Sequence, residues 1–137
     1  MANTLRLEIV TPEAKTYSED VEMVTLPGTE GEMGIYPLHE PLMTQIVAGE
    51  LCALKDGQPH FFAVGDGFAE ITGGRVAILT DMAIDSDNID EAKAEEARKR
   101  AEARQQEKLT EEEMASVTAS LAHSLTQLEV KRRHRKS

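Results

Sequence analysis

Two periodicities in the sequence predict a β + α fold, in which an antiparallel β-sandwich or flattened barrel precedes an antiparallel helical hairpin. Up to about residue 85, short apolar runs with a period of two are separated by turn-forming residues. The period lengthens after Asp81, and residues 89 to 108 contain neither Gly nor Pro. We therefore expect a β-sandwich domain over residues 1–85 and an α-helical hairpin over residues 86–137.

The expected strands are short and linked by hairpin turns. Leu5, Leu7 and Ile9 alternate with more polar residues and define the apolar face of the first strand, 5–10. Asp56-Gly57 and the segment 72–75 (TGGR) are typical of tight hairpins. The other expected strands are 21–26, 42–47, 51–54, 61–64, 68–71 and 76–80, and this spacing predicts an antiparallel sheet throughout.

Residues 33 to 42 interrupt the alternation. Gly34, Pro37 and Pro41 suit neither a central strand nor a helix interior. Proline fixes φ, while glycine permits turns that other residues resist. We expect a stiff surface loop suited to docking on a fixed partner, with an ordinary ordered turn as the alternative.

The first expected helix covers residues 89 to 108, preceded by the N-cap candidates of segment 85–88 (DSDN). Its apolar side consists mostly of alanine, namely Ala92, Ala94, Ala97, Ala101 and Ala103. Small side chains allow a second helix to approach closely.

The second helix is expected to begin at Thr110, which forms a capping box with Glu113. Large apolar residues then recur at spacings of three and four and predict a narrow seam against the alanine face: Met114, Val117, Leu121, Leu125 and Leu128. Because this seam buries little apolar surface, we expect the hairpin to separate readily from the sandwich.

Charge is spread unevenly along the chain, whose formal net charge is −10. Residues 1 to 88 hold 4 basic and 15 acidic residues, and the remainder holds 11 and 10. The acidic part argues against nucleic acid as a partner, whereas the basic end from Lys131 to Lys136 is either a solvated end or an anion-docking patch. No apolar run approaches the ~20 residues of a membrane span, so direct membrane insertion is not expected. The start of the chain has no signal or transit pattern.

The residues do not indicate an enzyme. A single cysteine, Cys52, rules out an internal disulfide, fits a reducing compartment and is more typical of a small core residue than of a nucleophile. The four histidines do not show a metal-ligand spacing, although His39 and His60 with a carboxylate could form a metal site inside a barrel. Because no nucleophile, base and orienting group can be assembled, the residues themselves indicate a binding module with no catalytic residues.

Five motifs occur in the order found in one known family: GEMGIYPLHEPL at 31–42, GEL at 49–51, GDGFAEI at 65–71, VAILTDMA at 76–83 and IDEAKA at 89–94. Together they resemble the epsilon subunit of F-type ATP synthases, in its bacterial form. The resemblance covers nearly the whole chain.

This resemblance implies a sandwich of about ten strands in the rotating central stalk of a proton-translocating ATP synthase. Such a subunit is non-catalytic, docks on the gamma subunit and the c-subunit ring, and lies at the cytoplasmic face of the plasma membrane as a peripheral part of the complex. By position, the residues implied to contact the c ring are Glu32, Met33, Gly34 and His39.

The resemblance also implies a regulatory role for the helices. In this family they fold against the sandwich or extend into the catalytic head, where they inhibit ATP hydrolysis. Basic side chains then meet an acidic loop, which implies contacts with the catalytic beta and alpha subunits through Arg98, Arg100, Arg104, Lys131, Arg132 and Arg133, with the basic end continuing to Lys136.

The chain departs from the family pattern at three places in the sheet region. Leu38 stands where Gly or Asn is common, Glu40 where a small residue is usual, and Asp66 where glycine is usual. These differences imply a c-ring contact that differs in detail.

Some bacterial relatives bind ATP through the first helix start and two arginines of the second helix. The matching positions here are Ile89, Asp90, Lys93, Ala94, His123 and Gln127. Lysine replaces a forked donor with a point charge, and Gln127 carries no charge, so we expect weak or absent ATP binding and no cofactor. A generic adaptor in another complex, a small metal enzyme and a nucleotide sensor are the competing hypotheses.

Overall fold

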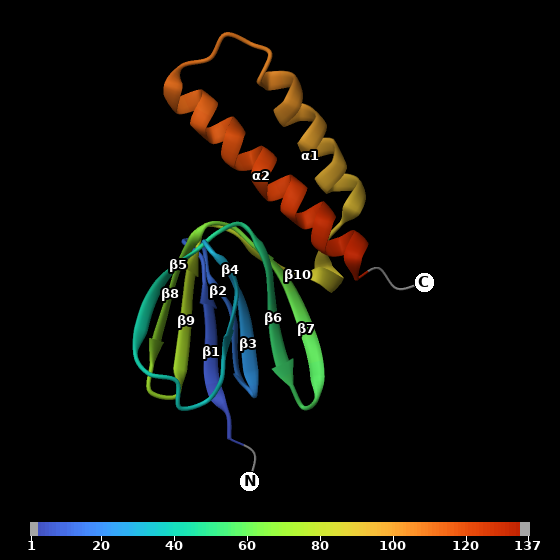
Figure 1. The fold of residues 1–137 in the computed structure, drawn as a ribbon. Helices are drawn as coiled ribbons and strands as arrows, with labels where there is room; N and C mark the ends of the chain where they lie inside the picture. Colours follow the sequence, from blue (N-terminus) through green and yellow to red (C-terminus); the bar gives the residue numbers. More distant parts are fainter. Residues whose placement is uncertain (1–2, 135–137) are drawn as a thin grey trace.

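The structure is a computed structural model that describes residues 3 to 134. Within these residues, ten strands form one curled sheet, and a hairpin of two helices projects from one end of it (Figure 1). The predicted fold class is thereby confirmed. The elements are β1 (Leu5–Val10), β2 (Lys15–Val21), β3 (Met23–Gly28), β4 (Gly31–Ile35), β5 (Leu42–Ile46), β6 (Gly49–Lys55), β7 (Gln58–Val64), β8 (Gly67–Thr72), β9 (Arg75–Thr80), β10 (Ala83–Asp85), the 3-10 helix η1 (Ser86–Asn88), α1 (Glu91–Arg104) and α2 (Glu111–Arg133).

The strand order is β10-β7-β6-β3-β5-β8-β9-β1-β2, with β4 forming a hairpin on β3. The predicted hairpins are present at β6–β7 and β8–β9, and Asp56 and Gly57 adopt the positive φ angles of a tight two-residue turn. One pairing differs from the prediction, because β1 and β9 run parallel, with Ile9 opposite Ile78. This pair joins distant parts of the sequence, so no local turn signal encodes it.

Three strands are missing from the sequence prediction. β2 carries few apolar residues, and β10 has only three residues. β4 contains Gly34, and its five residues are mostly exposed, so no alternation marks it. The prediction of a loop over 33–42 is therefore wrong for its first three residues: Met33 pairs with Leu26 and Ile35 with Val24 in the β3–β4 hairpin.

The sheet curls around one aliphatic core. Among the described residues, sixteen buried ones form it, and Phe62 is their only aromatic residue. Tyr17 of β2 meets Phe62 of β7 edge to face, with ring centroids 4.9 Å apart. Because β2 and β7 stand near opposite ends of the strand order, this contact shows that the two ends of the sheet fold toward each other.

The first helix starts later than predicted. Asp85 caps η1, and the carboxylate of Asp90 accepts the amide N–H of Lys93 at 3.1 Å at the start of α1. Only part of the alanine face is covered: Ala94 and Ala101 are buried, whereas Ala92 and Ala103 are exposed. The wide alanine face expected from the sequence is therefore narrower in the structure.

The second helix begins as predicted. The Thr110 hydroxyl accepts the amide N–H of Glu113 at 3.1 Å, and the Glu113 carboxylate accepts the amide N–H of Thr110 at 3.0 Å. The predicted seam is correct at the buried Val117 and Leu128 but wrong at Leu125, whose side chain is 46% exposed.

The apolar contact between hairpin and sheet lies near the open end of the hairpin (Figure 1). There Val130 of α2 and Ile89 pack on Ala63 of β7, forming a small second core. The connection between the helices, residues 105 to 110, lies at the far end of the hairpin (Figure 1).

Candidate functional site

The loop between β4 and β5 forms the end of the sheet opposite the helices. It spans residues 36–41, and His39 lines a shallow hollow there with Leu5, Thr72 and Gly74. The His39 Nδ1 atom lies 2.7 Å from the carbonyl oxygen of Glu40. Figure 1 shows that β1 begins at this end of the sheet.

Leu38 is the strained residue of this loop. Its φ is 68°, in the left-handed region that a branched side chain disfavours, and its side chain is 84% exposed. A position with this backbone suits glycine or asparagine, the residues that the family resemblance implies there.

The other predicted c-ring residues lie elsewhere. Glu32, Met33 and Gly34 belong to β4, and Glu32 and Met33 line a hollow beside the β3–β4 turn and Thr44. Strand β4 separates this hollow from His39. The structure therefore does not bring the predicted contact residues together in one small site.

A larger candidate surface was not predicted from the sequence. Met43, Phe68 and Leu79 are 64%, 53% and 49% exposed, and they belong to the neighbouring strands β5, β8 and β9. Phe68 pairs directly with Leu79 and with Gln45, two residues from Met43, so all three apolar side chains share the outer face. We call this trio the outer apolar patch.

The sequence pattern of β8 and β9 is compatible with this patch but does not specify it. The buried residues Ala69, Ile71 and Ile78 occupy the core-facing phase of β8 and β9, so Phe68 and Leu79 fall out of phase. In a continuous apolar run such as VAIL at 76–79, the sequence alone does not show which side chains face the core. Contiguous exposed apolar residues on a monomer mark interaction surfaces.

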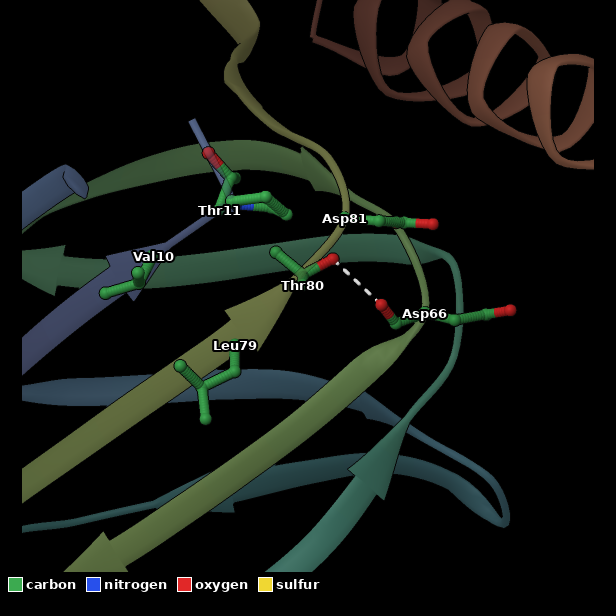
Figure 2. A pocket seen from close by; sticks show the side chains of 7 residues that line it. Val10, Thr11, Asp66, Leu79, Thr80 and Asp81 are labelled. Atoms are coloured by element: carbon green, nitrogen blue, oxygen red, sulfur yellow. Dashed lines mark hydrogen bonds between the residues drawn. The ribbon is translucent and has the colours of Figure 1, made fainter. Parts of the chain in front are cut away.

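The outer apolar patch continues into a hollow of about 380 Å³ at the end of β9. Figure 2 shows Val10, Leu79 and the carboxylates of Asp66 and Asp81 around it. The Thr80 hydroxyl donates to the Asp66 carbonyl oxygen at 3.0 Å, and the Asp66 carboxylate accepts the Ala48 amide N–H at 2.8 Å. Asp66 thus ties two turns together.

The predicted inhibitory arginines are engaged with acidic residues of the same chain. Arg98 pairs with Glu95 and Glu102 along α1, and Arg104 lies 3.6 Å from Glu113 of α2. Arg100 is exposed. Hydrogen bonding to Arg98, with a further bond from Arg132, lowers the pKa of Glu95, so this carboxyl stays ionised in the compact hairpin.

The last turn of α2 fastens the hairpin. Arg132 donates to Glu91 at 2.9 Å and to Glu95 at 3.0 Å, and these bonds, led by that to Glu91, raise the pKa of Arg132. Lys131 Nζ donates to the Ser86 carbonyl oxygen at 3.1 Å. Arg133 lies 3.3 Å from Glu50 of β6. Residues Arg135 and Lys136 of the predicted basic end lie outside the described residues.

The predicted nucleotide positions lie at the start of α1 and within α2. Ile89 and Ala94 are buried, and the Asp90 carboxylate is used as the cap of α1. His123 Nε2 lies 3.2 Å from the Asp81 carboxylate, while Lys93 is exposed. Two of the polar candidates, Asp90 and His123, are thus occupied by contacts within the chain.

The alternative metal site is not supported within residues 3 to 134. No group of three His, Cys, Asp or Glu side chains there converges on a point that could hold a metal ion. His39 lines the hollow at the β4–β5 loop, whereas His60 lines a different hollow beside Phe61 and Asp85. Burial raises the pKa of the Cys52 thiol, which disfavours the nucleophilic thiolate.

Two family profiles match the chain in succession, the first over the sheet and the second over the helical hairpin. The profile described as "ATP synthase, Delta/Epsilon chain, beta-sandwich domain" matches residues 4–86, and "ATP synthase, Delta/Epsilon chain, long alpha-helix domain" matches residues 87–132. The chain belongs to the ATP synthase delta/epsilon chain family. The resemblance predicted from the sequence motifs is thereby confirmed.

The chain aligns over almost its full length with curated ATP synthase epsilon chains. The chain is 41% identical over 126 residues to the ATP synthase epsilon chain of Herpetosiphon aurantiacus, covering 92% of this chain and 93% of the relative. It is 44% identical over 133 residues to that of Dehalococcoides mccartyi strain CBDB1, covering 96% and 95%.

Solved structures share the fold. A chain of the Euglena gracilis mitochondrial ATP synthase, solved as OSCP/F1/c-ring, aligns with a TM-score of 0.71 and 25% identity over 90% of this chain and 78% of that one. A chain of the Tetrahymena thermophila mitochondrial ATP synthase central stalk and c-ring aligns with a TM-score of 0.55 and 14% identity over 93% and 96%. The second likeness supports the fold alone. Among the described residues, no helix is long and apolar enough to cross a membrane.

Proposed function

We propose that this chain is a non-catalytic rotor subunit that couples the catalytic head of a proton-translocating F-type ATP synthase to its c ring. The outer apolar patch of β5, β8 and β9 carries the proposal, because a small monomer rarely leaves three large apolar side chains together in water. Membership of the ATP synthase delta/epsilon chain family indicates that the partner of the patch is another ATP synthase subunit. In this proposal the patch docks on the gamma subunit, and the complex holds the chain at the cytoplasmic face of the plasma membrane.

The c-ring contact is proposed for one or both ends of β4. Glu32, Met33 and Gly34 offer an exposed strand segment with a carboxylate, whereas His39 and Leu38 offer a stiff loop at the opposite end of the sheet. Substituting each end separately distinguishes them.

Co-purification tests the docking role. A tagged chain, expressed in the organism that encodes it, should bring down the ATP synthase head and c ring from solubilised membranes. Phe68→Asp with Leu79→Asp should abolish this capture, because docking would bury two unpaired carboxylates. Ala115→Asp with Ala119→Asp, which adds the same two charges at exposed positions of α2, is the matched control and should leave capture intact. Equal capture by the patch variant would refute docking through this face.

We further propose that the helices inhibit ATP hydrolysis when they extend toward the catalytic beta and alpha subunits. The compact hairpin supports this exchange, because Arg104, Arg132 and Arg133 pair with carboxylates of other elements and would need acidic replacements after release. Removing residues 89–137 should then raise ATP hydrolysis while the complex still assembles. If the truncated complex hydrolysed ATP at an unchanged rate, the inhibitory role would be refuted and only the coupling role would remain.

ATP binding to the isolated subunit is proposed to be weak or absent. His123 is held by Asp81, Lys93 lacks the guanidinium fork, and Gln127 is uncharged. Calorimetry with ATP and Mg²⁺ should show no micromolar binding. Micromolar affinity would favour the nucleotide-sensor hypothesis instead.

A further inference from the structure

The hollow at the end of β9 has two chemically different sides. Figure 2 shows Val10 and Leu79 on one side of it and Asp66 and Asp81 on the other. Residues 11 and 12, which follow β1, complete the wall. The volume of about 380 Å³ lies in the range of pockets that hold small ligands, so the hollow has room for a whole side chain of a partner.

The hydroxyl groups in the wall of the hollow are already engaged. The Thr11 hydroxyl donates to the Ala14 carbonyl oxygen at 3.2 Å, and the Thr80 hydroxyl donates to the Asp66 carbonyl oxygen at 3.0 Å. These bonds also hold the two turns that form the wall. An apolar side chain can therefore enter the hollow without leaving a hydroxyl unpaired, whereas a neutral polar side chain would lose its own hydrogen bonds to water.

The acidic side of the hollow keeps its negative charge. Asp66 makes no ion pair within residues 3 to 134, and the Asp81 side chain, which lies 3.2 Å from His123 Nε2, remains 51% exposed. Glu70 lies on the same outer face of β8 as Phe68, two residues along the strand. A lysine or arginine of a partner at this edge would therefore be attracted, whereas a carboxylate would be repelled.

The hollow adjoins the outer apolar patch. Val10 lies opposite Leu79 in the parallel register of β1 and β9, and Phe68 lies opposite Leu79 in the antiparallel register of β8 and β9. These three side chains form one apolar row across three strands, on the face away from the core. A partner that covers the patch also covers the mouth of the hollow.

We propose that this hollow is the anchor pocket of the docking face, and that it receives one large apolar side chain of the partner next to a lysine or arginine. The apolar side chain packs on Val10 and Leu79, and the cation faces Asp66 and Asp81. Hydrogen bonds within the chain fix the walls, so the pocket exists before docking, which lowers the entropic cost of binding. A filled pocket within an apolar surface is where binding energy concentrates. The identity of the partner rests on the proposed function, and the pocket adds the chemistry of the segment that this partner presents.

Two small probes test the pocket on the isolated chain. Phenethylammonium joins an aromatic ring to a cation, whereas hydrocinnamate joins the same ring to an anion. In NMR titrations, phenethylammonium should shift the amide resonances of Val10, Leu79 and Thr80 saturably at millimolar concentration. Hydrocinnamate should bind at least about fivefold more weakly, because the pocket edge is acidic.

A variant that fills the hollow provides the second arm. Val10→Trp places a large side chain of this chain in the hollow and should remove the saturable shifts. Thr118→Trp, which adds the same bulk at an exposed position of α2, is the control and should keep them. Wild-type amides that show no saturable shifts, or equal shifts with both probes, would overturn the proposal. The comparison of probes uses the wild-type chain, so it does not depend on the folding of a variant.

Capture of the ATP synthase separates the anchor pocket from the docking role. Val10→Trp should lower capture by the tagged chain about tenfold at limiting concentration, because it blocks the anchor side chain. If Val10→Trp captured as well as the wild type while Phe68→Asp with Leu79→Asp abolished capture, the anchor pocket would be refuted and the docking role would stand. If neither variant changed capture, both proposals would fail.

Discussion

The sheet and the hairpin are stabilised in different ways. The sheet encloses a core of sixteen buried residues, whereas the hairpin meets it through a small cluster of Ala63, Ile89 and Val130 with partly buried neighbours. Ion pairs add to this contact, from Arg133 to Glu50 of β6 and from His123 to Asp81, while Arg132 joins α2 to Glu91 and Glu95 within the hairpin. Apolar burial is insensitive to pH, while partly exposed ion pairs contribute little each and depend on charge.

This contrast matches the proposed division of labour. A subunit that transmits rotation needs a body that does not deform, whereas a regulatory element needs two arrangements close in free energy. The predictions below separate the two parts. The division at residue 85 into independently folding domains itself stays a prediction.

The largest effect is expected in the sheet core. Ile78→Ala removes a fully buried side chain and should lower the free energy of unfolding by about 2 to 5 kcal/mol in urea denaturation followed by circular dichroism. Leu79→Ala, at the next residue but on the outer face, is the control and should stay within about 0.5 kcal/mol. Equal losses would contradict the assigned phase of β9.

A smaller and local effect is expected at the hairpin contact. Val130→Ala removes two methyl groups from the second core and should weaken docking by about 2 kcal/mol. Exchange of α1 and α2 amides should accelerate while the sheet amides keep their protection. A uniform loss of protection over the whole chain would show that sheet and hairpin unfold as one unit.

The capping box gives a further prediction for the hairpin. Thr110→Ala should destabilise the start of α2 by about 1 kcal/mol, seen as faster exchange of its first amides. Hydrogen bonds from Thr110 lower the pKa of Glu113 in the folded chain. The Glu113 contribution is therefore present above the ordinary glutamate pKa of about 4.3 and is lost as the pH falls through the lower folded-state value. Acid titration of the wild type should show this loss, and the variant should show less of it.

The smallest effect is expected at the β4–β5 loop. Leu38→Asn should stabilise the sheet by about 0.5 to 1 kcal/mol, because asparagine tolerates the positive φ better and Leu38 buries little. The urea midpoint should rise slightly. A lower midpoint would mean that the leucine side chain makes a stabilising contact.

Local patterns predicted most of the elements. Alternation located β1 and the cores of β5 to β9, and the Asp56-Gly57 turn and the Thr110 capping box appear as expected. Failures arose where local signal was weak, as in the polar β2, or where tertiary contacts decide, as in the parallel pairing of β1 with β9.

The candidate sites were less predictable. The contact of His134 with Glu50 joins residues 84 positions apart, and no sequence spacing encodes it. The outer apolar patch depends on which face of β8 and β9 is covered, which a continuous apolar run does not specify. Motif resemblance identified the family, but it could not show that Glu32 and His39 lie at opposite ends of β4.

Native-state hydrogen exchange on the intact chain tests most directly whether a rigid sheet carries a separable hairpin. Amides of β1, β8 and β9 should exchange only through global unfolding, whereas those of α1 and α2 should exchange through an opening that costs several kcal/mol less. Equal protection of helices and core strands, with the same response to urea, would contradict it.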